Sequence, residues 1–128
     1  MKKLILPIAL IIFSCLAEDS CESTPKLTTA GAEDISDVYA TISGTISPPT
    51  CDDTVTSQGF VYGEENLLTV EDTKIIRSGS SISAPLTNLN QNTTYYVRTF
   101  FENPIGVYYG NEVIFNSINR HFALLINY

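Results

Sequence analysis

Thr94-Tyr-Tyr-Val-Arg-Thr-Phe-Phe-Glu102 is the stretch that decides the fold of this 128-residue chain. It is rich in aromatic and β-branched residues, which favour an extended strand. The residues Asn103-Pro104-Ile105-Gly106 follow at once and are typical of a turn. They lead into a further strand, predicted from Val107 to Phe115.

Shorter runs upstream have the same character. Val38 to Ile46 alternates strictly between small or apolar residues and hydroxyl-bearing residues, which indicates a half-buried strand. Pro85 interrupts another run and favours a position at the edge of a sheet. The predicted strands before Thr94 are 38–46, 55–63, 74–77 and 82–86. No apolar repeat at helical spacing follows the N-terminal segment, so we predict an all-β antiparallel sandwich of about seven strands.

The N-terminal segment has the features of an export signal. Lys2 and Lys3 precede an apolar run from Leu4 to Phe13, and Ser14-Cys15 follows. The run has 10 residues, about half of the roughly 20 that a membrane-spanning helix needs. Ile12-Phe13-Ser14-Cys15 resembles a lipobox, which implies removal of residues 1–14 and lipidation of Cys15. An ordinary cleaved signal and a retained membrane helix are the alternatives.

The segment after Cys15 bears on location and charge. Leu16-Ala17-Glu18-Asp19 resembles the acidic signal that sends some lipoproteins to the surface of the bacterial outer membrane; a solvated acidic linker is the alternative. Loss of the signal would remove Lys2 and Lys3 and change the net charge from −7 to −9. Such an acidic body repels nucleic acid, so we expect no nucleic-acid partner.

Three parts of the sequence resemble a fibronectin type III domain. Leu89-Asn-Gln-Asn-Thr-Thr-Tyr95-Tyr96-Val97-Arg98 is similar to its turn and sixth strand, and Gln58-Gly59-Phe60-Val61-Tyr62-Gly63 is similar to the third strand of the version found in bacterial envelope proteins. The end of that version resembles 103–113. The resemblance implies a domain at 25–117, with a lipidated tether at 15–24 and an apolar tail of unassigned role at 118–128. The chain lacks the tryptophan common in animal members.

The resemblance gives Tyr95 the role of the tyrosine corner, whose hydroxyl binds backbone a few residues upstream. Alternation from Tyr95 then turns Val97, Thr99 and Phe101 inward. It leaves an outward stripe, which makes a candidate binding face for protein or sugar: Tyr96, Arg98, Phe100 and, on the next strand, Tyr108. Ordinary cross-strand pairing that stabilises the sheet is the alternative.

Cys21 and Cys51 are candidates for a disulfide. They are the cysteines left after Cys15, and a bacterial envelope is oxidising enough for them to pair. In a sandwich of this type, the first strand starts at the end where the loop between strands two and three lies. Cys21 precedes that strand and Cys51 falls in that loop, so the implied bridge would leave only 15–21 as a free tether. The loops near Asn103–Gly106 would then face the membrane.

Catalytic chemistry has little support. The single histidine, His121, lies in the tail, and the acidic pairs lack the spacing of a metal cage. We therefore expect no enzyme, no metal and no cofactor. The expected function is a lipid-anchored outer-membrane protein, exposed on the cell surface, whose sandwich binds an envelope protein or a glycan. The alternative is a periplasm-facing structural accessory of a larger envelope complex; no oligomeric state is predicted.

Overall fold

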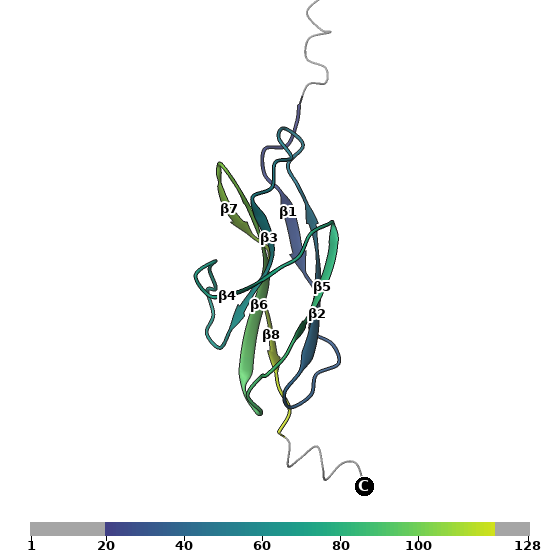
Figure 1. Cartoon of the computed structure of the whole chain (residues 1–128), viewed down its shortest axis with the longest axis vertical. Helices are drawn as coiled ribbons and strands as arrows, with labels where there is room; N and C mark the ends of the chain where they lie inside the picture. Colours follow the sequence, from purple (N-terminus) through teal and green to yellow (C-terminus); the bar gives the residue numbers. More distant parts are fainter. Residues whose placement is uncertain (1–19, 120–128) are drawn as a thin grey trace, which may run out of the picture.

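The computed structural model describes residues 20–119, and these form two antiparallel sheets packed face to face (Figure 1). No helix occurs within this range. The eight strands are β1 (Lys26–Thr29), β2 (Ala40–Ser47), β3 (Ser57–Gly63), β4 (Thr73–Ile76), β5 (Ser81–Leu86), β6 (Thr94–Asn103), β7 (Gly106–Tyr109) and β8 (Val113–Asn116). The predicted all-β antiparallel sandwich is confirmed.

The first sheet has the order β1-β2-β5. β2 alternates as predicted, with Ala40, Ile42 and Ile46 buried against the second sheet. β5 lies at an edge, as Pro85 indicated, and pairs with β2 so that Pro85 is opposite Thr41. Because Pro lacks an N–H, an edge position costs the sheet no hydrogen bond.

The second sheet has β6 at its centre, with β3 and β4 on one side. On the other side β6 pairs with two separate strands, β7 along Phe100–Asn103 and β8 along Thr94–Val97. The prediction of one continuous strand from Val107 to Phe115 is therefore wrong. Residues 110–112 interrupt the register of paired residues opposite Arg98 and Thr99.

The core lies between the sheets and is largely aliphatic and aromatic. β6 supplies Tyr95, Val97 and Phe101 to it, which agrees with the predicted inward set. Thr99, the fourth inward residue, is fully buried and bonds to Thr29 of β1, with Thr99 N–H donating to Thr29 Oγ1 at 2.9 Å. A hydroxyl thus joins the two sheets at mid-height.

The described chain enters at one end of the sandwich and leaves at the other (Figure 1). The expected signal at 1–14, the lipidated Cys15 and His121 with most of the tail lie outside the described residues. Between residues 20 and 119, no helix has the length and apolar character needed to cross a membrane.

Candidate functional site: a loop docked on the second sheet

The predicted aromatic stripe is not an open surface. Phe100 is 0% exposed, and Tyr96 and Arg98 are half-buried. Tyr108 turns inward, because β7 places it opposite Phe101, and its ring centroid lies 6.5 Å from that of Phe101. The outward assignment of Tyr108 is therefore wrong. Its neighbour Tyr109 lies opposite Phe100 instead, since residues paired across strands share a face.

A segment between β3 and β4 covers this outward face. We call residues 66–70, Asn66-Leu67-Leu68-Thr69-Val70, the lid. Leu68 is 1% exposed and forms a second apolar cluster with Val61 and Phe100. Val70 packs on the margin of this cluster. Burial of one large aliphatic side chain contributes roughly 1.5–3 kcal/mol, so the lid and sheet stabilise each other.

Side chains of the second sheet hold the lid's backbone. Glu112 accepts the N–H of Leu67 on one oxygen at 3.2 Å and the N–H of Leu68 on the other at 3.1 Å. The Tyr109 hydroxyl accepts the N–H of Val70 at 2.9 Å. Arg98 Nη2 donates to the carbonyl of Leu68. Three side chains therefore bind one short stretch of backbone.

Arg98 is the charged centre of this arrangement. Its guanidinium carbon lies 4.0 Å from the centroid of the Tyr109 ring, a cation–π contact. Within residues 20–119 the ion pair is formed by Lys26 and Glu22. Arg98 therefore has no carboxylate partner among these residues. Its Nε is buried and has no hydrogen-bond partner among the residues that the structure describes. The site therefore retains one unused buried donor.

Gly110-Asn111-Glu112, the bulge between β7 and β8, organises both sides of the second sheet. A Cβ on Gly110 would collide with Thr99 and crowd Leu27, so only glycine fits this approach. Asn111 Oδ1 accepts the N–H of Thr29 at 2.8 Å and Asn111 Nδ2 donates to the Thr29 carbonyl at 2.9 Å, which ties β1 to the bulge. Glu112 points to the lid. A glycine inside a strand pattern is a recognised signal for a bulge, but sequence reasoning missed it here.

Tyr95 makes the contact that the resemblance implied. Its hydroxyl accepts the N–H of Asn90 at 2.7 Å, and its ring stacks on Phe115 with centroids 5.6 Å apart. The role is structural, because Tyr95 is only 4% exposed and lies in the main core.

Cys21 and Cys51 are joined in a disulfide, with their Cα atoms 5.0 Å apart. The N–H groups of Thr50 and Cys51 both donate to the Glu22 carbonyl beside the bridge. Further along the same loop, the hydroxyl and N–H of Thr54 donate to Asp52 and lower the pKa of its carboxyl. The bridge fixes the start of the described chain to the loop between β2 and β3.

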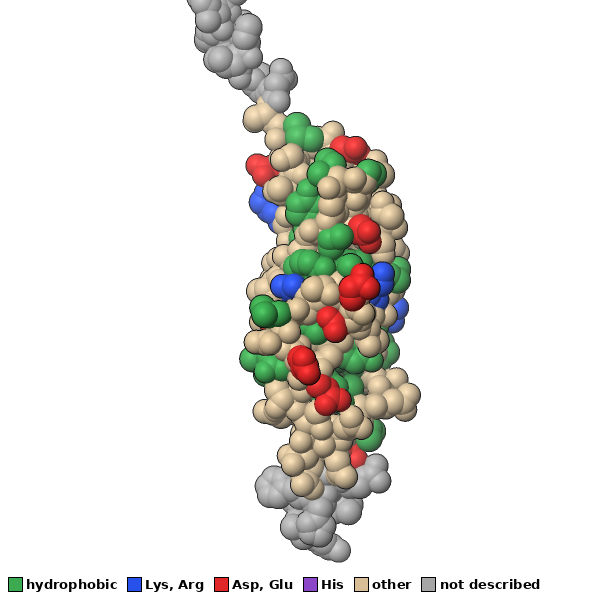
Figure 2. All heavy atoms as spheres, turned by 90° about the vertical axis from the view of Figure 1, so that its left-hand side faces the viewer, with side chains coloured by type: hydrophobic (Ala, Val, Ile, Leu, Met, Phe, Trp, Pro, Cys, Tyr) green, Lys and Arg blue, Asp and Glu red, His purple; other side chains and the backbone are tan. Residues whose placement is uncertain are grey.

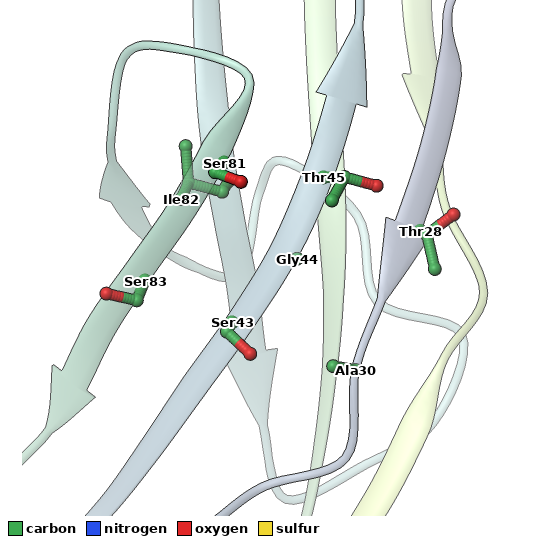
Figure 3. Close-up of a pocket in the computed structure, with 8 residues that line it drawn as sticks. All are labelled: Thr28, Ala30, Ser43, Gly44, Thr45, Ser81, Ile82 and Ser83. Atoms are coloured by element: carbon green, nitrogen blue, oxygen red, sulfur yellow. The ribbon is translucent and has the colours of Figure 1, made fainter.

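The outer face of the first sheet differs from that of the second sheet in its side-chain chemistry. A shallow groove of about 380 Å³ crosses β1, β2 and β5 there. Figure 3 shows that its lining is dominated by small hydroxyl side chains. These are Thr28, Ser43, Thr45, Ser81 and Ser83. With no aromatic ring or charged group in the lining, this groove has little with which to orient a ligand.

Seen in space-filling form, the second sheet's outer side carries apolar side chains interspersed with acidic and basic ones (Figure 2). Among residues 20–119, no group of three histidine, cysteine or acidic side chains is placed to hold a metal ion. The arrangement on this face is suited to holding a short bent backbone segment and one apolar side chain.

Comparison with solved structures supports the fold. The sensor domain of the anti-sigma factor RsgI4 from Pseudobacteroides cellulosolvens, in solution, gives a TM-score of 0.55 at 17% identity, covering 73% of this chain and 74% of that one. A structure described as a myokine gives 0.53 at 15% identity, over 77% and 99%. The fibronectin type III domain of human fibronectin type III domain containing protein 3 gives 0.50 at 17%, over 80% and 91%.

No protein-family model and no curated protein sequence matches the chain. At identities of 15–17% the structural likeness shows the fold alone. The chain therefore has a fibronectin type III-like β-sandwich fold.

Proposed function

We propose that this chain is a non-enzymatic, lipid-anchored module of a bacterial cell envelope that binds a protein partner. The observation that carries the binding role is the second sheet's outer side, where Arg98, Tyr109 and Glu112 hold the backbone of a short bent segment over an apolar floor. The proposed anchor rests on the sequence from Lys2 to Cys15. The fold itself hosts many functions, so the function is argued from the site.

A protein partner fits this face better than a glycan. Sugar stacking needs an open aromatic ring, whereas Phe100 is buried and the Tyr109 ring is occupied by Arg98. Backbone N–H and C=O groups are what the three polar side chains already bind. The chemistry on offer is therefore that of peptide recognition.

The proposed anchor is consistent with the position of the disulfide. Cys21–Cys51 lies where the described chain enters the sandwich, and Cys21 is six positions after Cys15. A tether of this length spans at most about 20 Å. The end that carries the bridge would then face the bilayer, and a cell-surface location would leave the sheet flanks free for a partner.

Metabolic labelling with palmitate tests the anchor. We expect label on the wild-type chain and none on Cys15→Ser, which should also leave the membrane fraction. The double variant Cys21→Ser/Cys51→Ser is the matched control, because it removes the other two cysteines and keeps Cys15. Equal membrane association of Cys15→Ser would contradict the proposal. Surface labelling of intact cells then separates exposure outside the cell from a periplasm-facing accessory role.

A further inference from the structure

The lid is bound to the second sheet in the way a separate peptide would be bound. Its N–H groups at Leu67, Leu68 and Val70 and its C=O at Leu68 all pair with side chains. Within the described range, the lid makes no backbone–backbone hydrogen bond to a strand. The lid is therefore attached to the sheet through three side chains and one buried leucine.

Two features of the lid mark it as an imperfect occupant. Leu67 has a φ of 60°, in the left-handed region that leucine rarely adopts, and its side chain is 77% exposed. Beneath the lid, Arg98 Nε is buried and finds no acceptor in the described part of the chain, although buried donors are nearly always paired. A different segment in the same place could relieve the unfavourable φ at the position of Leu67. It could also supply a carbonyl to Arg98 Nε.

We propose that the surface under the lid is a binding groove for a short bent segment of a partner protein, and that the lid occupies it as an internal substitute until the partner displaces it. Val61 and Phe100 form the floor, and Tyr96 and Tyr109 lie at its margin. The groove rests on the proposed function in one respect, namely that the partner is a protein. It does not depend on the lipid anchor.

The bonds of the lid define the partner's chemistry. Glu112 requires two successive N–H groups, Arg98 requires the carbonyl of the second residue, and Tyr109 requires an N–H two residues later. The second residue must carry a large aliphatic side chain, because Leu68 fills the space over Val61 and Phe100. Proline is excluded at all three donor positions, since it has no N–H.

A peptide in trans is the direct test. The probe is a synthetic peptide with the sequence of residues 64–72, and the host is the whole isotope-labelled Leu68→Ser protein in detergent, followed by NMR. Tethered segments have effective concentrations in the millimolar range, so the peptide is titrated to about 5 mM. We expect saturable shifts at the amides of Val61, Arg98 and Phe100.

Two altered peptides serve as matched controls. A peptide with Leu68→Ser should lose binding, while one with Leu67→Ser should retain it, because Leu67 is exposed and Leu68 is buried in the lid. No shift up to about 5 mM, or equal binding by both altered peptides, would overturn the proposal.

Hydrogen exchange on the wild-type protein gives an independent readout should Leu68→Ser fail to fold. A displaceable lid opens locally, so its amides at Leu68 and Val70 should exchange at least about 100-fold faster than those of Phe60 and Val61 in β3. Exchange of the lid at the rate of β3 would show that it leaves only on global unfolding, and would overturn the proposal. Loss of palmitate labelling would overturn the anchor and leave both results on the groove unchanged.

Discussion

Side chains alternate between inward and outward positions in both sheets, but the two outer faces differ. One faces water, and the other is covered. On the first sheet, the outward positions carry Ser43, Thr45 and Ser83, which can face water without cost. On the second sheet, they carry Val61 and Phe100, which are covered by Leu68. Period two determines which way a side chain points, and the chemistry of the outward set determines whether something must cover it.

The cover differs from the sheet it protects in how it is held. Strands bind one another through regular backbone ladders, whereas the lid depends on Arg98, Tyr109 and Glu112. A few side-chain bonds make an element that can open without loss of the fold. The following experiments test this contrast, beginning with the largest expected effect.

Phe100→Ala should be the most damaging of these substitutions. Because Phe100 is fully buried under the lid, its truncation leaves a cavity and should lower the free energy of unfolding by about 3–5 kcal/mol. Urea denaturation measures the change. Ser83→Ala, an outward residue of the first sheet, is the control and should change stability by less than about 0.5 kcal/mol. A loss below about 1 kcal/mol for Phe100→Ala would mean that the outer face of the second sheet is not a core.

Loss of the disulfide should have the next largest effect and should act on the first sheet. The bridge joins residues 30 apart in sequence, and its removal by Cys21→Ser/Cys51→Ser should reduce stability by about 2–4 kcal/mol in the chain-entropy model. Hydrogen exchange should show faster opening of β1. Selective loosening of the lid in the double variant would contradict the separation of the two regions.

Asn111 and Glu112 are neighbours that serve opposite sides of the molecule, so they form a matched pair. Asn111→Ala strips both partners from the buried backbone of Thr29 and should cost about 1–3 kcal/mol. Glu112→Ala should cost less, about 0.5–1.5 kcal/mol, because the exposed N–H of Leu67 can bind water instead.

Amide exchange separates the two variants. Asn111→Ala should accelerate exchange at Thr29 and leave the lid unchanged, and Glu112→Ala should do the reverse. If both variants loosened both places equally, the bulge would act as a single unit and the lid would not be an independent element.

Much of the fold could be predicted from the sequence because alternation is a local property. The inward set of β6 and the edge position of β5 follow from residues such as Val97 and Pro85 without knowledge of distant partners. The tyrosine corner and the bridge came from resemblance to a family whose topology is shared. In each case the signal lies within a few residues or within a known framework.

The candidate site could not be predicted in the same way, because it depends on register and on a loop. Tyr108 and Tyr109 are adjacent and chemically alike, and only the pairing of β7 with β6 decides which of them faces outward. The lid has no strand pattern, and its docking on Phe100 joins residues about 30 positions apart. Gly110 was the one local clue, since a glycine within a strand marks a bulge.

The smallest effect should arise at Asp52, in the loop that connects the two sheets. The titration of Asp52 serves as a control for both outer faces, because neither face should respond to it. Hydrogen bonds from Thr54 lower the pKa of the Asp52 carboxyl below its ordinary value of 3.8. A group with a lowered folded-state pKa stabilises the fold above its ordinary pKa, and that contribution is lost as the pH falls through the lowered value. NMR titration should show the lowered pKa of the Asp52 carboxyl. The variant Thr54→Val keeps only the backbone donor and should move this pKa part of the way back to its ordinary value. Because Asp52 is fully exposed, neither the hydroxyl face nor the lid should respond. Shifts of Leu68 or Ser83 in step with the Asp52 titration would mean that the loop couples the two faces.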